Sequence, residues 1–347
     1  MLLEGIFLPL TTPFHSDGRL FLHKLGSNVE HYSRTQAAGM LVLGQASEAG
    51  SLTDAEVRQV LETSIGAAGD EKVMIAAVGR DGVSATLLLA DAASDLGYDA
   101  VAVRAPEFGV QESMSREVAM YFKAVADRSP LPLVLLSDRE RPLDGAFVAE
   151  LARHTNILGV IDESSSAKTI AELIAATAGI SRQVTVTSTF AAVPNRMLRQ
   201  VVPGGAGNFV SAVSLSRGTA VIAPPVPAVK TRTKLVGFQV LTAAASGMLE
   251  AWNTGAVGAI PRLGACAPQA CCEVWQAFRD GDPALAAEKQ HRILTAAALV
   301  EGWCGIAALK YGCDLNAYFG GMTRLPLLPL SGEERAEVEA ALAGLKN

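Results

Sequence analysis

Residues 156–166, which read Asn-Ile-Leu-Gly-Val-Ile-Asp-Glu-Ser-Ser-Ser, decide the fold that we expect for this chain. The apolar run up to Ile161 predicts a short strand, because strands that are buried on both faces are continuously apolar. The polarity changes at Asp162 and Glu163, where the strand ends. Parallel α/β folds place their functional side chains at such carboxyl ends. We therefore expect a functional site at the end of this strand.

The same pattern of an apolar run and an amphipathic segment recurs along the chain. Strands are predicted over 5–14, 40–44, 72–79, 100–106, 132–137, 157–163, 238–242 and 257–260. Helices are predicted over 21–37, 83–96, 114–127, 145–154 and 167–178, and from a capping box at Thr53 and Glu56 onward. Eight strand–helix units favour a closed (β/α)8 TIM barrel over an open doubly wound sheet. No Gly-x-Gly-x-x-Gly follows the first strand, which argues against a dinucleotide-binding fold.

The predicted domains are a barrel over 1–265 and a C-terminal region of three or four helices over 266–347. The segment at about 179–236 breaks the alternation, and we predict it to be an insertion before the seventh strand. A connection of this length is either functional or poorly ordered. We expect it to lie over the barrel mouth or at an oligomer contact, and the alternative is a surface elaboration without function.

Composition restricts the class of protein. The 347 residues are half apolar, which suffices for one large α/β domain. A net charge of −6 argues against nucleic acid as a partner and against an anionic membrane surface. No apolar stretch approaches the length of a membrane span, and no signal peptide is found. Five cysteines, an odd number, indicate reduced thiols and a cytoplasmic protein.

Several motifs, in the right order, resemble those of the dihydrodipicolinate synthase / N-acetylneuraminate lyase family of class I aldolases. The sixth-strand motif of that family is matched at Gly159, Val160, Asp162 and Ser164, and further matches lie at 5–14, 44–56, 132–137 and 310–327. The pair Gly320-Gly321 and the strand at 238–241 resemble the 4-hydroxy-2-oxoglutarate aldolase-like branch. The resemblance implies a TIM barrel, a homo-oligomer (dimer or tetramer) and a small 2-oxo acid or other carboxylate as ligand.

The positions that carry the chemistry of the family are replaced. The Schiff-base lysine position holds Ile161, and the proton-relay tyrosine of the fifth strand falls on Leu136. Two threonines of the family correspond to Gln45 and Ala46 in this chain, and a tyrosine pair of the family corresponds to Glu107 and Phe108. A class I aldolase needs a lysine amine of lowered pKa to form its iminium, and isoleucine offers no nucleophile. We therefore predict no Schiff base with pyruvate or other 2-oxo acids.

No other lysine is expected to take over this role. Lys168 begins the helix after the sixth strand, and its loop would have to fold back over the mouth. Lys123 and Lys310 lie on helical patterns, and we predict both to be solvated surface charges.

The residues predicted to contact the ligand lie at or just after the ends of strands. They are Thr12, Gln45, Ser47, Glu48, Phe108, Ser137, Arg141, Asp162 and Glu163. The resemblance implies that Arg141 holds the carboxylate of the substrate. No catalytic residue is assigned, and no hydrolase triad is read around Ser47 or Ser137.

Four carboxylates lie at or just after the ends of predicted strands: Glu48, Asp138, Asp162 and Glu163. They would repel one another unless a cation or an arginine lay between them. One interpretation is an oxygen-rich site for Mg²⁺ or Mn²⁺. The favoured interpretation is a structural network of ion pairs and helix caps, with neither a metal nor a cofactor. The candidate cationic partners are Arg104, Arg139, Arg141 and Arg262. Cys266, Cys271 and Cys272 lack the paired spacing of a zinc site, and we predict them to be buried apolar residues.

Three hypotheses about function remain open. The first is a ligand-binding or regulatory homologue that keeps a pocket but forms no Schiff base. The second is a carbon–carbon lyase that acts on a 2-oxo acid through a metal or through acid–base chemistry, which the fold favours by analogy alone. The third is a scaffold protein whose insertion and helical tail are interaction surfaces. The sequence leaves open whether the chain is an enzyme.

Overall fold

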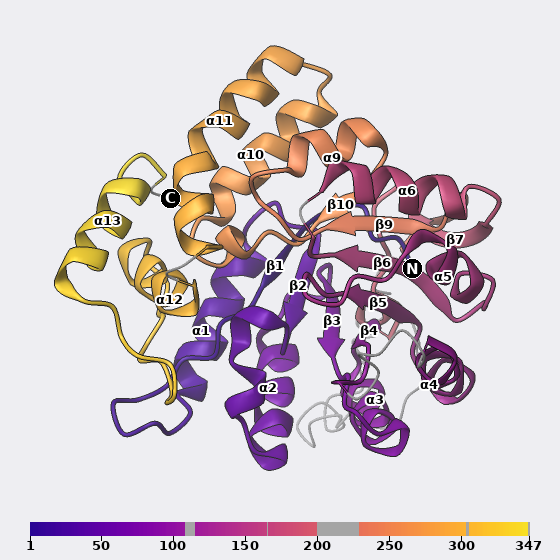
Figure 1. Cartoon of the computed structure of the whole chain (residues 1–347), viewed down its shortest axis with the longest axis horizontal. Coiled ribbons are helices and arrows are strands. Elements are labelled where there is room, and N and C mark those ends of the chain that lie inside the picture. The colour runs from indigo at the N-terminus through magenta and orange to yellow at the C-terminus, as the bar shows by residue number, and fades with distance from the viewer. Residues whose placement is uncertain (108–114, 165, 200–228, 303–304, 346–347) are drawn as a thin grey trace, which may run out of the picture.

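The computed structural model describes residues 1–107, 115–164, 166–199, 229–302 and 305–345, and it contains a closed barrel of eight parallel strands (Figure 1). Around the barrel the strands follow the order β1-β10-β9-β6-β5-β4-β3-β2. They are β1 (Gly5–Pro9), β2 (Gly39–Val42), β3 (Val73–Ala77), β4 (Ala100–Arg104), β5 (Leu133–Ser137), β6 (Ile157–Asp162), β9 (Gln239–Thr242) and β10 (Gly258–Ala259). The predicted (β/α)8 TIM barrel is confirmed.

Helices connect the strands and cover the outside of the barrel. They are α1 (Leu22–Ser33), α2 (Asp54–Ala67), α3 (Val83–Leu96), α4 (Ser115–Arg128), α5 (Gly145–Leu151), α6 (Ala167–Thr177) and α9 (Met248–Thr254). The predicted capping box opens α2, where the Thr53 hydroxyl accepts the Glu56 N–H at 3.3 Å and the Glu56 carboxylate accepts the Thr53 N–H at 2.9 Å. No helix of the described residues is long and apolar enough to cross a membrane.

The C-terminal region is helical, as expected. A 3-10 turn, η5 (Arg262–Ala265), follows the last strand, and the region then forms α10 (Pro268–Arg279), α11 (Pro283–Val300), α12 (Gly305–Leu315) and α13 (Gly332–Leu342). Figure 1 shows these helices, in orange to yellow, along one side of the barrel, with α10 and α11 next to α9 and α12 next to α1. The C-terminal region therefore packs along the barrel between α9 and α1.

Strands β6 and β9 are adjacent in the barrel although the insertion separates them in the sequence. Gly159 pairs with Gln239 at this junction, and a Cβ on Gly159 would lie 2.2 Å from the carbonyl oxygen of Gln239. Only glycine, which has no side chain, permits such a close backbone approach. The glycine of the sixth-strand motif thus lets the barrel close across the insertion.

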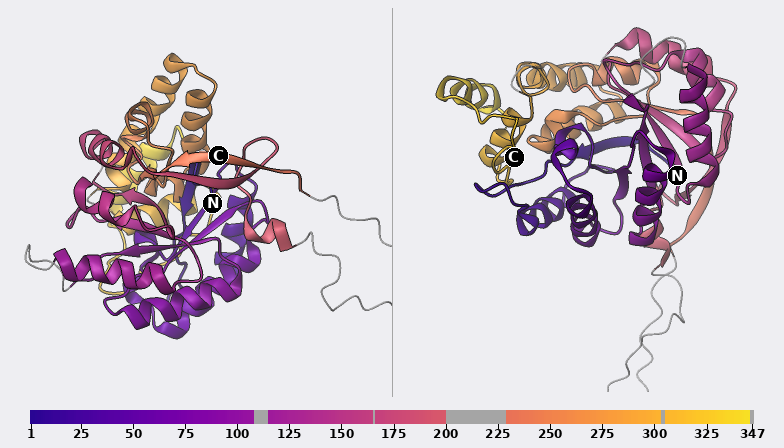
Figure 2. Two further views of the ribbon diagram at one scale, coloured as in Figure 1. Left: turned by 90° about the vertical axis from the view of Figure 1, so that its right-hand side faces the viewer. Right: turned by 60° about the horizontal axis from the view of Figure 1, so that its bottom comes forward.

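The insertion forms a separate antiparallel sheet of two strands, β7 (Ser181–Thr187) and β8 (Thr231–Gly237), with the short helix α7 (Asn195–Arg199) between them. Its position before the seventh barrel strand agrees with the prediction. The buried side chains of Val184 and Val186 pack on Leu2, which precedes β1. Figure 2 shows the two strands beside the N-terminus. The segment Ser181–Thr187 of the insertion is therefore a strand, but one outside the barrel.

Polar contacts fix α7 against the same end of the barrel. The Asp99 carboxylate accepts the N–H of Asn195 at 2.6 Å, and Arg196 donates to the carbonyls of Gly69 and Lys72, both at 2.8 Å. These partners directly precede β3 and β4, so they lie at the amino ends of the strands. The expected position over the mouth is thus wrong for the described part of the insertion, and residues 200–228 lie outside the described residues.

Candidate functional site

A cavity of about 300 Å³ lies at the carboxyl ends of the barrel strands. Its wall combines apolar residues of the barrel with charged residues of the mouth loops and of the C-terminal region. The lining residues are Pro9, Leu41, Gln45, Ala46, Asp138, Arg139, Glu140, Ile161, Glu163, Ala243, Ala244, Ile260, Arg262, Glu301 and Gly302. We call this space the mouth cavity, and it is the candidate site.

The end of β6 alternates between the mouth cavity and the outside of the barrel. Ile161 and Glu163 line the cavity, whereas Asp162 does not. Asp162 is buried, and the hydroxyl of Ser164 donates to its carboxylate at 2.5 Å. Burial raises the pKa of Asp162, although this bond opposes the shift. Successive side chains of a strand point to opposite faces, which explains why the two predicted neighbours are separated.

Glu163 is one of the ionisable groups that line the mouth cavity. The side-chain amide of Gln45 donates to its carboxylate. Burial raises the pKa of Glu163 to about 7, the negative charge of Asp138 adds to this shift, and Arg262 and Arg139 oppose it. At neutral pH the group is therefore close to half protonated. A carboxyl group in this state can both donate and accept a proton.

Glu301 enters the mouth cavity from the end of α11. Its carboxylate accepts the N–H of Leu263 at 3.1 Å and the N–H of Ala245 at 3.1 and 3.2 Å. The guanidinium of Arg262 donates to the backbone carbonyl of Glu301. Burial raises the pKa of Glu301, and these backbone bonds oppose the shift. The residue connects the loops after β9 and β10 to the C-terminal region. It was not predicted, because no pattern within α11 identifies a contact with those loops.

A second cavity, of about 400 Å³, lies at the ends of β2 to β5. It is lined by Leu43, Gly44, Gln45, Glu48, Ala49, Gly50, Leu52, Asp54, Ala77, Gly79, Arg80, Arg104 and Leu136. Leu136 occupies the position where the resemblance places the relay tyrosine. Gln45 lines both cavities, so its side chain lies at the boundary between them.

Glu48 and Lys310 form a buried ion pair beside this second cavity. The exposed fraction is 1% for the Lys310 side chain and 0% for that of Glu48. The ammonium of Lys310 also donates to the carbonyl of Met322 at 2.6 Å and lies 4.4 Å from the ring centroid of Phe14. Burial lowers the pKa of Lys310, and the charge of Glu48 opposes the shift. Our prediction of a solvated Lys310 is wrong, because helical spacing does not reveal a carboxylate that a distant loop supplies.

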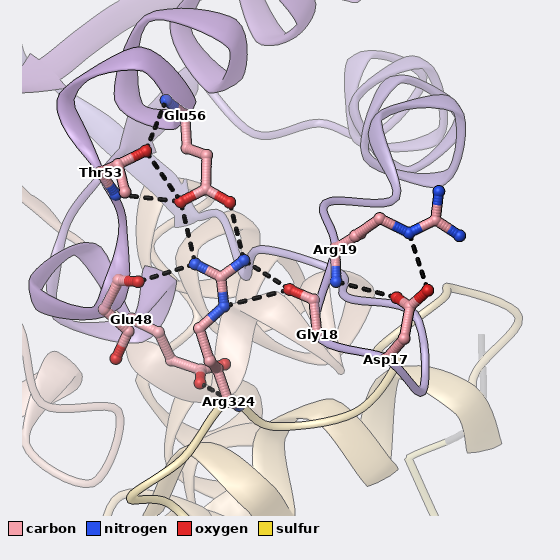
Figure 3. A network of polar contacts seen from close by, with 8 residues as sticks. Asp17, Gly18, Arg19, Glu48, Thr53, Glu56 and Arg324 are labelled. Atoms are coloured by element: carbon pink, nitrogen blue, oxygen red, sulfur yellow. Dashed lines mark hydrogen bonds and ion pairs between the residues drawn. The ribbon is translucent and has the colours of Figure 1, made fainter.

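Arg324 extends this network to the first turn of α2 (Figure 3). Its guanidinium donates to both carboxylate oxygens of Glu56, at 2.8 and 3.0 Å, and to the carbonyl of Gly18. Its backbone N–H donates to the Glu48 carboxylate at 2.8 Å. The hydrogen bonds from Arg324 lower the pKa of Glu56 to about 2. The loops after β1 and β2 are thereby connected to the C-terminal region.

Three predicted contact residues are buried in local structure instead. Thr12 is buried after β1. The hydroxyl of Ser47 donates to the carbonyl of Gly44 at 2.6 Å, and that of Ser137 accepts the N–H of Leu143 at 3.0 Å. None of the three lines either mouth-side cavity. Such bonds stabilise turns and leave little capacity for a ligand.

The predicted arginines divide between the two cavities. Arg139 and Arg262 line the mouth cavity, and Arg104 lines the second one, where it pairs with Glu107 at 3.2 Å. Arg141 lines neither cavity. Its guanidinium lies 3.9 Å from the carboxylate of Asp138 and donates to the carbonyl of Pro106 at 3.4 Å. Of the predicted contact residues, the two cavities thus bring together Gln45, Glu48 and Glu163. Phe108 lies outside the described residues.

Within the described ranges, no group of three or more His, Cys, Asp or Glu side chains is arranged to hold a metal ion. The described cysteines are Cys266, Cys271, Cys272 and Cys313, and all four are buried. Burial raises the pKa of their thiols, which keeps them protonated and unreactive.

Lysines are absent from the described linings of both cavities. The side chain of Lys168 is 87% exposed on α6, where it pairs with Glu172 at 3.8 Å. The ammonium of Lys310 faces Glu48 and a small separate cavity. Among the described residues, no amine is therefore directed into the mouth cavity.

Comparison with known proteins agrees with the barrel fold. The pattern of the dihydrodipicolinate synthetase family matches residues 2–217 and 228–345. A 4-hydroxy-tetrahydrodipicolinate synthase of Acidiphilium cryptum is 26% identical over 347 residues, which cover 99% of this chain and 98% of that protein.

Two solved structures share the fold. A dihydrodipicolinate synthase of Bacillus anthracis superimposes with a TM-score of 0.78 at 19% identity, with 100% of both chains covered. A prophage protein of the dihydrodipicolinic acid synthase family from E. coli K12, solved in complex with pyruvate, gives a TM-score of 0.77 at 20% identity, with 99% of both chains covered. The chain belongs to the dihydrodipicolinate synthetase family.

Proposed function

We propose that this chain binds a small carboxylate, such as a 2-oxo acid, in the mouth cavity without forming a Schiff base, as a ligand-binding or regulatory member of its family. The observation that carries the proposal is the wall at the end of β6, where Ile161 occupies the expected lysine position. Arg139 and Arg262 line the same cavity and supply positive charge for a carboxylate. The pyruvate complex of the E. coli K12 relative supports this class of ligand.

Borohydride trapping tests the proposal directly. The protein is incubated with pyruvate or with 4-hydroxy-2-oxoglutarate, the substrate type of the branch it resembles, then reduced, and its intact mass is measured. We expect no adduct. An adduct would overturn the proposal, and peptide mapping would then show which lysine had reacted. Thermal shift with the same acids, without reductant, measures binding separately.

The variant Ile161→Lys should restore trapping without restoring turnover. The new amine would enter a cavity whose apolar wall and two arginines, Arg139 and Arg262, favour the neutral, nucleophilic form. Its iminium with pyruvate would then be reducible to one adduct per chain. Turnover should stay at background, because Leu136 provides no hydroxyl for proton relay. Intact mass and a pyruvate-release assay measure the two properties. Ile161→Met, of similar size but without an amine, is the matched control, and trapping in this control would show that the adduct forms elsewhere.

Carboxylate binding should strengthen as the pH falls. Below its pKa of about 7, Glu163 loses its negative charge, which relieves repulsion of an anion in the same cavity. We expect binding about tenfold tighter at pH 6 than at pH 8, the effect of roughly 1.4 kcal/mol. Calorimetric titration with pyruvate at both pH values measures the ratio. In Glu163→Gln the ratio should fall to near one, and an unchanged ratio in that variant would assign the effect to another group.

A second candidate function is a carbon–carbon lyase that uses acid–base chemistry on a 2-oxo acid. The observation that favours it is Glu163, whose pKa of about 7 suits a general acid or base at neutral pH. Turnover without a trapped adduct, abolished in Glu163→Gln, would support this candidate over simple binding. If neither binding nor turnover is found, the third hypothesis, a scaffold protein, remains.

We further infer a cytoplasmic homo-oligomer, either a dimer or a tetramer, from the family resemblance and the cysteine content. Light scattering of the purified protein tests the assembly, and a monomer at micromolar concentration would contradict it.

A further inference from the structure

The turn that carries Gln45 has an unfavourable backbone conformation at its end. Glu48 separates the 3-10 turns η1 (Gln45–Ser47) and η2 (Ala49–Ser51), with φ 55° and ψ 34°. This left-handed region is uncommon for a residue with a side chain, and it persists where surrounding contacts hold it. The contacts of the Glu48 side chain therefore decide whether the turn keeps its shape.

Those contacts come from the C-terminal region. One carboxylate oxygen of Glu48 accepts the backbone N–H of Arg324 at 2.8 Å. The other oxygen, Oε1, is buried and has no partner among the described residues besides the ammonium of Lys310. Lys310 is itself held by the carbonyl of Met322 and by the face of Phe14. Without Lys310, a buried charge at the end of the turn would be left uncompensated.

The start of the same turn reaches the mouth cavity. Gln45 is the first residue of η1, and its amide donates to Glu163 on the opposite wall. A hydrogen bond to an ionised carboxylate favours the ionised form. The position of Gln45 thus acts on the charge of Glu163, and the backbone of Gln45 belongs to η1, which Gly44 precedes and Glu48 follows.

We propose that Lys310 is a positioning residue for the mouth cavity: its ion pair with Glu48 holds the turn Gln45–Ser47 so that Gln45 donates to Glu163. The C-terminal region then controls the protonation of Glu163 through Lys310, although Lys310 does not line the mouth cavity. The inference goes beyond the proposed function and does not depend on it, because it concerns the unliganded cavity.

The test is the ionisation midpoint of Glu163, read from the side-chain carboxyl carbon in protein labelled with ¹³C-glutamate. The signal is assigned by its loss in Glu163→Gln. The other charged groups that act on Glu163 or line the same cavity are Asp138, Arg139, Glu140, Asp162, Arg262 and Glu301. All six are kept in every variant, so that a change of the Glu163 midpoint reports a change in the turn Gln45–Ser47.

Three outcomes are expected. Gln45→Leu should raise the midpoint by about half a pH unit or more, as the loss of one hydrogen bond to a carboxylate predicts. Lys310→Met should raise it in the same direction and by a similar amount. The double variant should show no further rise, because both changes remove the same hydrogen bond.

The control is Lys168→Met, which removes an exposed lysine of α6 and should leave the midpoint unchanged. Lys310→Arg keeps the charge and should restore most of the wild-type midpoint. If Lys310→Met does not fold, Glu48→Gln breaks the same ion pair and should give the same rise. A lowered melting temperature with an unchanged midpoint, in either variant, would overturn the proposal and leave Lys310 a purely structural role.

Discussion

Replacing Lys310 by methionine should lower the free energy of unfolding by about 3 to 5 kcal/mol, the cost of breaking a buried ion pair on one side. The ammonium is buried and has three partners: the Glu48 carboxylate, the Met322 carbonyl and the ring of Phe14. Methionine fills much of the same volume but leaves the Glu48 charge without its counter-ion. Urea unfolding, followed by tryptophan fluorescence, measures the change.

Two comparisons make this result specific to the ion pair. The exposed Lys168 pairs loosely with Glu172, and Lys168→Met should change stability by less than about 0.5 kcal/mol. The double variant Glu48→Gln, Lys310→Met should be more stable than Lys310→Met alone, because it leaves no isolated charge. A loss below about 1 kcal/mol in Lys310→Met would mean that water reaches Glu48 and replaces the lysine.

Glu163→Gln should stabilise the protein more at pH 8 than at pH 5, by about 2 to 3 kcal/mol. In the folded protein the pKa of Glu163 is raised from 4.5 to about 7. Between these values the folded state keeps a proton that the unfolded state has lost, so the stability of the wild type falls as the pH rises through this window. At about 1.4 kcal/mol for each pH unit, the full displacement from 4.5 to about 7 corresponds to about 3.5 kcal/mol, and the change from pH 5 to pH 8 covers about three quarters of it. Glutamine does not ionise, so the stability of the variant does not fall with pH for this reason.

Urea unfolding of the wild type and of Glu163→Gln at the two pH values tests this expectation. Glu172→Gln, on the exposed face of α6, is the control, and its effect should be similar at pH 5 and pH 8. If Glu163→Gln raises the free energy of unfolding by the same amount at both pH values, the carboxylate of Glu163 is well solvated or neutralised by Arg139 and Arg262.

The barrel itself was predictable because its signals are local. Each strand is a short apolar run and each helix has its own spacing, so the eight units can be recognised without any knowledge of contacts. The end of β6 was predictable for the same reason, and Ile161 and Glu163 line the cavity as a strand of period two requires. Asp162 lies between these two residues in the sequence, so its side chain points to the opposite face of the strand and does not line the cavity.

The long-range contacts were not predictable in this way. The burial of Lys310 depends on Glu48, and the position of Glu301 depends on loops that follow β9 and β10. The insertion lies at the amino ends of the strands because Asp99 and Arg196 hold it there, and neither residue belongs to a motif. Contacts between distant segments leave no pattern in either segment alone.

The division into a barrel over 1–265 and a helical region over 266–347 remains a prediction. Lys310 and Glu301 both lie in the C-terminal part and contact loops of the barrel mouth. We therefore expect the two parts to unfold together, and a barrel expressed without the C-terminal part should lose the shape of its mouth.

Gln45 also lies between the two cavities at the carboxyl ends of the barrel strands. Its side chain stands at the boundary of the two cavities and is held there by Glu163 on the far wall. The two cavities have volumes of about 300 and 400 Å³. If Gln45 alone divides them, Gln45→Ala should connect the two spaces and let the variant bind a longer carboxylate than the wild type binds.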